Sequence, residues 1–206
     1  MNLEEIRKNT IENIQNKVDL INIHLPLLDS DIIIGDKEAL VNRIEILHLL
    51  YTISIEGLDS KGFFYNIIKE KGLDKALSKN EFLFLDEGTS VNRNMINFSW
   101  YKESIYALLW CGGLVQEIYS LEEINMGNFY SLIPPEVSVE QFLDSIKLRT
   151  EKEMLVVLDY YYNLHWSFKH SEKGNSETLS IIRERRKSLE WFLYNYNSWD
   201  NVLLDT

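Results

Sequence analysis

The chain has 206 residues, 45% of them hydrophobic, and its 32 acidic residues outnumber the 21 basic ones to give a net charge of -11. This length fits one large domain or two small ones that share a core, and the apolar content argues against an intrinsically disordered chain. The negative charge argues against nucleic-acid and anionic-membrane partners, because both are bound mainly through Lys and Arg side chains. Solubility is the simplest explanation of the acidity.

The cysteine content and the apolar runs indicate the cellular compartment. The single cysteine, Cys111, excludes a disulfide within the chain and a cysteine-rich zinc site. The N-terminal residues lack the apolar run of a signal peptide, and no stretch reaches the roughly 18 apolar residues of a membrane span. We therefore predict a soluble cytoplasmic protein.

The apolar residues of the first half of the chain recur with a helical period. We expect one helix from about residue 3 that ends at or before Pro26, a second over 36–57 and a third over 60–72. Ser78 and Glu81 have the spacing of a capping box, which predicts a short helix through Leu85. Residues 88–97 are polar and rich in Asn, so we expect a loop there.

The second half is also predicted to be helical. The strongly apolar residues 98–110 form a helix that a Gly-Gly pair ends, and residues 114–137 are irregular with a Pro-Pro break. A second capping box at 138–141 starts helix that continues to about residue 168 with a break near Thr150, and a turn at 173–176 leads to a last helix over 177–195. We find no repeat and no linker. The fold class is therefore all-α, a single-domain irregular bundle of about eight helices with a non-helical tail.

Two patterns of metal-ligating residues are weak. Glu45 and His48 have the Glu-x-x-His spacing of di-iron bundles, but those sites need a second copy, which the chain lacks. His165 and His170 are five residues apart and do not share a helix face. We interpret Glu45 as a surface residue and His48 as partly buried, and we predict no metal site.

No common catalytic motif is present either. Cys111 follows an apolar run at a helix C-terminus, which disfavours a reactive thiolate and favours a small buried side chain. The chain has no nucleophile elbow, phosphate-binding glycine loop or dinucleotide fingerprint. We therefore predict no cofactor.

Charged residues on apolar helix faces are the more informative feature. In the last helix, Arg185 and Arg186 interrupt an apolar stripe, so one guanidinium must meet a carboxylate at the core edge, and Asp159 is the candidate partner. Arg43 lies within another stripe, and Arg149 stands at the helix break. Two interpretations are open: an Arg-lined pocket that binds an anion, or a buried ion-pair network, which we favour.

Two further clusters have structural interpretations. The basic run 183–187 contains a Glu and lies in an acidic chain, so we interpret it as a helix face paired with acids and predict no nucleic-acid binding. The five tryptophans could stack a ligand, but large aromatic residues usually fill the core. They are Trp100, Trp110, Trp166, Trp191 and Trp199.

Several blocks of the chain together resemble one family. The central block is Trp100 to Trp110, with Glu103 between them, and the next is Leu148-Arg149 followed by a long helix. The remaining matching positions are Arg43, Ser78, Glu81, Leu85, Asp159, His165, Trp166, Glu184, Arg185, Leu189, Trp191, Trp199, Asp200, Asp205 and Thr206. From about residue 43 to residue 206, the chain resembles the bacterial domain of unknown function 4272.

The resemblance implies an ordered C-terminal tail and supplies no substrate. Its polar positions coincide with the arginines and Asp159 singled out above, and the tail aspartates are candidate partners of those arginines. It therefore favours a polar cluster at the centre of the fold, either structural or ligand-binding. The candidate ligand-binding residues are Arg43, Arg149, Asp159, His165, Trp166, Arg185, Trp199, Asp200 and Asp205.

The distribution of charge suggests a function. Residues 103–146 contain seven acids and no Lys or Arg. We therefore expect a non-enzymatic interaction module, for example an immunity-type protein that masks a toxin, with a basic protein as partner. The alternative is an enzyme or small-anion binder that uses the arginine–carboxylate cluster. The expected partner surface comprises Glu117, Glu122, Glu123, Glu136, Glu140 and Asp144.

Overall fold

The computed structural model describes residues 2–87, 91–172 and 175–205, and this part of the chain is helical without a strand. The predicted all-α bundle of about eight helices is confirmed. The α-helices are α1 (Leu3–Ile14), α2 (Lys37–Glu56), α3 (Lys61–Glu70), α4 (Lys79–Glu87), α5 (Val91–Ser99), α6 (Tyr101–Cys111), α7 (Val139–Ser145), α8 (Glu151–His170) and α9 (Ser176–Leu193). Short 3-10 helices occur at Leu58–Ser60, Leu73–Ala76, Met126–Asn128, Tyr130–Leu132 and Trp199–Asn201.

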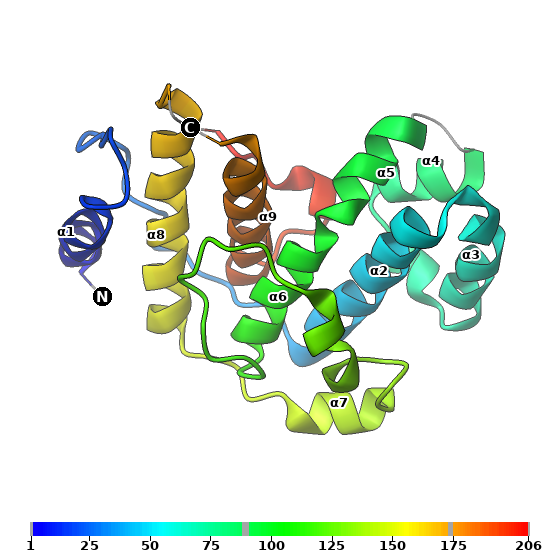
Figure 1. The fold of residues 1–206 in the computed structure, drawn as a ribbon. Coiled ribbons are helices and arrows are strands. Elements are labelled where there is room, and N and C mark those ends of the chain that lie inside the picture. Colours follow the sequence, from blue (N-terminus) through cyan, green and yellow to red (C-terminus); the bar gives the residue numbers. More distant parts are fainter. Residues whose placement is uncertain (1, 88–90, 173–174, 206) are drawn as a thin grey trace.

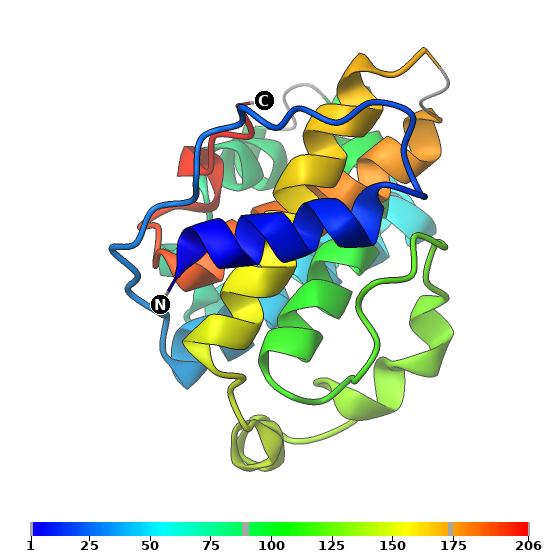
Figure 2. The same cartoon turned by 90° about the vertical axis from the view of Figure 1, so that its left-hand side faces the viewer.

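The long helices lie in a row across the molecule. α1 crosses the outer face of α8, α8 packs on α9, α9 packs on α6, and α6 packs on α2 (Figures 1 and 2). α3, α4 and α5 gather around α2 at the opposite end from α1 (Figure 1). The segment between α6 and α8, which includes α7, runs along the edge of this row (Figure 1).

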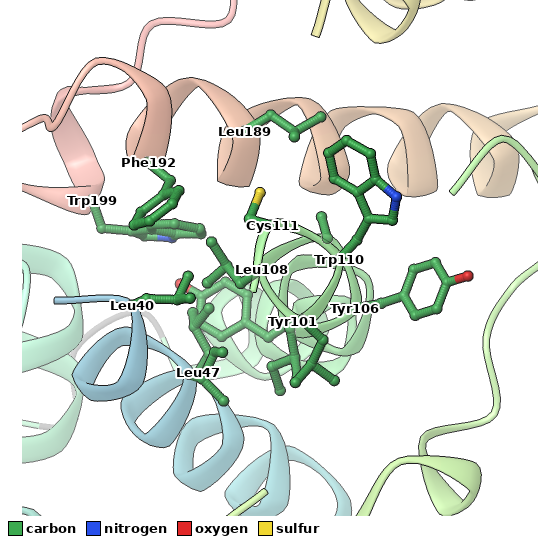
Figure 3. Close-up of a cluster of buried hydrophobic side chains, with 14 of the residues drawn as sticks. Leu40, Leu47, Tyr101, Tyr106, Leu108, Trp110, Cys111, Leu189, Phe192 and Trp199 are labelled. Carbon is green, nitrogen blue, oxygen red and sulfur yellow. The ribbon is translucent and has the colours of Figure 1, made fainter. Parts of the chain in front are cut away.

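α6 is the central helix of the core. All of its residues are buried except Lys102, which is partly exposed. Figure 3 shows its side chains between Leu40 and Leu47 of α2 on one side and Leu189 and Phe192 of α9 on the other. A helix that is apolar on nearly every side needs neighbours all round, and this explains its central place.

The first helix is shorter than predicted. α1 ends at Ile14, and residues 18–35 are an extended segment that crosses α8 and reaches α9 (Figure 2). The N–H of Gly35 donates to the carbonyl of Phe192 at 2.9 Å, and a Cβ on Gly35 would lie 2.9 Å from the Phe192 ring. Nearer to α1, the carbonyls of Leu25 and Pro26 accept hydrogen bonds from the Arg7 side chain instead of from helical N–H groups.

The expected loop at 88–97 is wrong for its second part, because α5 begins at Val91, while residues 88–90 lie outside the described residues. Phe98 of this helix is buried, with its ring centroid 4.9 Å from that of Phe84 and 5.0 Å from that of Tyr101. Such packing outweighs the low helix propensity of Asn. The predicted helix over 98–110 is accordingly divided at Trp100 into α5 and α6.

The helix-start signals are confirmed. Glu81 and Ser78 exchange both hydrogen bonds of a capping box at α4, and Ser138 and Gln141 do so at α7. The break near Thr150 is an extended segment after α7, and Thr150 caps α8. The predicted turn at 173–176 falls partly on residues outside the described ranges.

The C-terminal tail is non-helical as predicted, apart from one short 3-10 helix at Trp199–Asn201. Trp199 is buried against the core, and its ring centroid lies 6.3 Å from that of Tyr101. Across the described residues, no helix combines the length and the apolar character needed to cross a membrane.

Candidate functional site

Arg185 on α9 and Glu103 on α6 form a buried ion pair. Nε and Nη2 of Arg185 donate to Oε2 of Glu103 at 2.8 and 2.6 Å, and Arg185 also donates to the carbonyls of Ser120 and Glu122. The other carboxylate oxygen of Glu103 accepts the N–H of Ile124 at 2.9 Å. The pair therefore holds residues 120–124 of the acidic segment against α6 and α9.

The prediction that Asp159 pairs with Arg185 or Arg186 is wrong, because Asp159 pairs with Arg7 on α1. Nη2 of Arg7 lies 2.8 Å from Oδ1 of Asp159, and Arg7 also donates to the carbonyls of Leu25 and Pro26 at 2.7 and 2.9 Å. Arg7 belongs to the buried face of α1, so its place among apolar positions was a usable signal in the sequence.

His165 on α8 lies in a second buried network. Nη1 of Arg186 is 2.7 Å from Nδ1 of His165, and Nε of Arg186 donates to Glu190 at 2.8 Å. A guanidinium can only donate, so Nδ1 accepts and the imidazole is neutral. Burial and the nearby charge of Arg186 lower the pKa of His165 to about 3.

Arg149 braces the segment that follows α6. Its Nε donates to the carbonyl of Trp110 at 2.8 Å, its Nη2 donates to the carbonyl of Val115 at 2.9 Å, and its guanidinium lies 4.4 Å from the centroid of the Trp110 ring. It also contacts Glu153 at 3.5 Å. These partners satisfy the side chain from within the protein.

Arg43 joins α2, α4 and the tail. Its Nη2 donates to Oε2 of Glu81 at 3.0 Å, and its guanidinium lies 5.1 Å from the centroid of the Trp199 ring. The same Glu81 oxygen accepts the N–H of Ser78, and the hydroxyl of Tyr101 lies 3.5 Å from the other oxygen. Arg43 and Glu81 are both buried.

The predicted site residues are thus divided among networks with different partners. Arg43 and Trp199 share one network, and Arg185 and Glu103 form another. Asp159 belongs to a third network, in which it pairs with Arg7. The Arg7 guanidinium there lies 5.6 Å from the centroid of the Tyr162 ring. Of the other predicted residues, the Trp166 ring stacks on His170, and Asp205 is exposed.

A polar cleft adjoins the Arg43 network. It has a volume of about 560 Å³ and opens between α4, α5, the start of α6, α9 and the C-terminal tail, which is drawn in red in Figure 1. Tyr101 and Asp200 contribute to its walls, together with Asn80, Asn94 and Asn97. The cleft is thus built by segments that are far apart in the sequence.

Lys187 of α9 lies in the cleft wall, and the sequence did not single it out as a site residue. Its Nζ lies 4.8 Å from the centroid of the Trp199 ring, and it forms no ion pair with any carboxylate that the structure describes. Burial lowers the pKa of its ammonium group, while Glu184, Glu81 and Asp200 oppose that shift. Arg183, one turn earlier on α9, is exposed at the same cleft.

The two carboxylates in the cleft wall have neutral hydrogen-bond donors. Glu184 accepts from Oγ of Ser104 at 2.7 Å, and Asp200 accepts from the backbone N–H of Asn80 at 3.0 Å. Neither of these two carboxylates forms an ion pair with Lys187. The basic run 183–187 therefore splits: Arg185 and Arg186 pair with acids in the core, as the interpretation of the run as a paired helix face expected, while Arg183 and Lys187 face the cleft.

The remaining reactive groups are buried. Burial raises the pKa of the Cys111 thiol to about 12, so this thiol stays protonated. Glu45 is buried and paired with Lys71, which corrects its expected place on the surface, and Nδ1 of His48 contacts the carbonyl of Pro134 at 3.1 Å. Within the described ranges, no three metal-ligating side chains converge.

All six residues of the predicted partner surface are exposed: Glu117, Glu122, Glu123, Glu136, Glu140 and Asp144. Two of them have partners within the fold. Glu117 accepts backbone N–H groups of residues 118–120, and Glu123 pairs with Lys102.

The fold and the cleft define an all-α protein in which buried ion pairs hold the helices and a polar pocket lined by Lys187 lies beside the C-terminal tail. The chain belongs to the DUF4272 family, a domain of unknown function whose model matches residues 7–202. The match extends the expected range, which began near residue 43, back to Arg7. No curated protein and no solved structure matches the chain.

Proposed function

We propose that this protein binds a small anionic ligand in the cleft beside the C-terminal tail. The observation that carries the proposal is the pairing state of the cations. Arg43 and Arg185 are buried and neutralised by carboxylates, whereas Lys187 lines the cleft without such a partner in the described part of the chain. An anionic group of a ligand would supply the missing partner.

The size and chemistry of the walls support the same proposal. A volume of about 560 Å³ lies within the range of small-molecule sites, roughly 300–1,000 Å³. Asparagine side chains offer donors and acceptors, and Trp100 and Tyr101 offer flat apolar surface. In this proposal the Arg43–Glu81 pair positions the cleft wall and does not itself bind ligand.

Calorimetry and thermal shift with inorganic phosphate, succinate and ribose 5-phosphate test the proposal. We expect one of these anions to bind, and Lys187→Gln to weaken it about 10- to 100-fold, the value of a lost charge-assisted hydrogen bond. Lys75→Gln is the matched control, because Lys75 is exposed and lies outside the cleft wall. Equal affinity of the Lys187 and Lys75 variants, or no binding of any of the three anions at millimolar concentration, would contradict the proposal.

A second candidate function is docking of a basic protein on the acidic segment. It is favoured by the exposure of all six acids together with Tyr119 and Tyr130, since tyrosines are enriched at protein interfaces. The version that we propose is an immunity-type role in the bacterial cytoplasm. The Arg185–Glu103 pair would then hold the docking segment in place.

Co-purification with the products of neighbouring genes tests this second function. The variant to use carries Gln or Asn at Glu122, Glu136, Glu140 and Asp144, because Glu117 and Glu123 have partners within the fold. Loss of a basic partner from this variant would support docking. Retention of that partner would refute a role for the acidic surface.

A further inference from the structure

The wall of the cleft contains carboxylates as well as cations. Glu184 lies on α9 and Asp200 lies in the C-terminal tail, and both line the cleft together with Lys187. Neither carboxylate forms an ion pair with a basic side chain that the structure describes, whereas the buried Glu81 and Glu103 are each paired with an arginine. The cleft wall therefore carries charges of both signs that are not neutralised within the described part of the chain.

Each of these two carboxylates is held by a neutral donor and keeps one oxygen for a further hydrogen bond. Oε2 of Glu184 accepts from the hydroxyl of Ser104, which is buried, at 2.7 Å. Oδ2 of Asp200 accepts from the N–H of Asn80 at 3.0 Å. The second oxygen of each carboxylate accepts no hydrogen bond from any residue that the structure describes. Both carboxylates are thus oriented by the protein and can accept a donor from a ligand, and an ammonium group is a strong donor to a carboxylate.

The charges of opposite sign are close together without being in contact. Glu184 and Lys187 are three residues apart on α9, which places their Cβ atoms roughly 5–6 Å apart on one face of the helix. The Lys187 ammonium group nevertheless lies over the Trp199 ring, with Nζ 4.8 Å from the ring centroid, and forms no ion pair with Glu184. A small molecule whose positive and negative groups are separated by a few bonds can therefore contact the lysine and a carboxylate at the same time.

We propose that the ligand of the cleft is a small zwitterion, whose anionic group binds Lys187 and whose ammonium group binds Glu184 and Asp200. This inference rests on the proposed function, because Lys187 remains the partner of the anionic group. It narrows the ligand class from small anions to anions that also carry an ammonium group. The anionic group is a carboxylate or a phosphate, since a lysine binds either as a point charge. A second negative group on the ligand would instead be repelled by the two carboxylates.

Calorimetry with two pairs of isosteric molecules tests the inference. O-phosphoethanolamine differs from propyl phosphate only in an ammonium group that replaces a methyl group, and 4-aminobutyrate differs from pentanoate in the same way. We expect the zwitterion of at least one pair to bind about 10- to 100-fold more tightly than its isostere, the value of a charge-assisted hydrogen bond. The pair that shows this preference identifies the anionic group as phosphate or carboxylate. Equal affinities within both pairs would overturn the inference.

Variants of the two carboxylates locate the ammonium site. Glu184→Gln and Asp200→Asn remove the negative charge but keep a side-chain oxygen that can accept from Ser104 and from Asn80. The double variant should bind the zwitterion and its isostere with equal affinity. Glu70→Gln is the matched control and should keep the wild-type preference, because Glu70 is exposed and lies outside the cleft wall. A double variant that still prefers the zwitterion as strongly as wild type would refute the proposed ammonium site.

The anion contact is tested separately from the ammonium contact. Lys187→Gln should weaken both members of a pair, because both use the same anionic group. Binding of propyl phosphate or pentanoate with no gain from the ammonium group would refute the zwitterion alone. Failure of all four molecules to bind at millimolar concentration would contradict the proposed anion site as well.

Discussion

The contact between Arg186 and His165 makes the stability of the protein depend on pH in a defined way. Nδ1 of His165 accepts from the Arg186 guanidinium at 2.7 Å, so a protonated imidazole would place two positive groups in contact inside the protein. Burial and Arg186 lower the pKa of His165 from its ordinary value of 6.5 to about 3. In the unfolded chain the imidazole regains its ordinary pKa.

The sign and size of the effect follow from linkage. Below about pH 6.5 the unfolded state binds a proton that the folded state does not, so stability that is present above this pH is lost as the pH falls towards about 3. The slope approaches about 1.4 kcal/mol per pH unit. Between about pH 7 and about pH 5, His165 alone should remove about 2 kcal/mol from the free energy of unfolding.

Urea unfolding of wild type and His165→Gln at both pH values measures this term. Gln can accept the Arg186 hydrogen bond without titrating, so the variant should lose about 2 kcal/mol less than wild type on acidification. His170→Gln is the control, since His170 is exposed on the same helix. Identical pH dependence of wild type and His165→Gln would refute the assignment of a neutral, buried His165.

The remaining predictions concern the core. Glu103→Gln leaves Arg185 buried without its carboxylate and should lower the free energy of unfolding in urea by about 3–5 kcal/mol. Glu123→Gln, also in the acidic stretch 103–146, should lower it by less than about 1 kcal/mol. Equal losses would contradict a buried pair. Gly113→Ala puts a Cβ 2.4 Å from the Lys147 carbonyl at a φ of 74° and should cost roughly 2 kcal/mol or more, while Gly62→Ala, with open space, should gain about 0.5 kcal/mol in thermal unfolding; a tolerated Gly113→Ala would contradict this geometry. The Cys111 thiol should resist Ellman's reagent in the folded protein and react after denaturation in guanidinium chloride, and rapid reaction of the folded protein would show that it is exposed.

Local signals in the sequence determined the fold class and most helix starts. The 3.6-residue period of the apolar residues acts over short distances, and so do the capping boxes at Ser78 and Ser138, so both can be interpreted from one segment alone. The helix boundaries that were predicted wrongly lie in segments that contact distant parts of the chain. The segment after α1 bonds to Arg7 through the carbonyls of Leu25 and Pro26 and to α9 through the N–H groups of Ile33 and Gly35. Phe98 of α5 is buried in the core.

The sequence also identified the arginines that require partners, but the tertiary structure alone assigned those partners. A guanidinium on an apolar face must be neutralised wherever it is buried, so Arg43 and Arg185 could be singled out from periodicity. Which carboxylate neutralises each arginine depends on which helices pack together. In this fold Arg185 pairs with Glu103, and Asp159 pairs with Arg7.

The same distinction applies to the cleft and to the net charge. The uneven distribution of the charge of -11 is a property of the sequence, and the structure exposes all six of the predicted surface acids. That Lys187 lines a cavity without an ion-pair partner in the described residues depends on how α4, α5, α9 and the tail meet. A cavity arises where distant segments pack together incompletely, and the pattern of residues along the chain does not show which segments these will be.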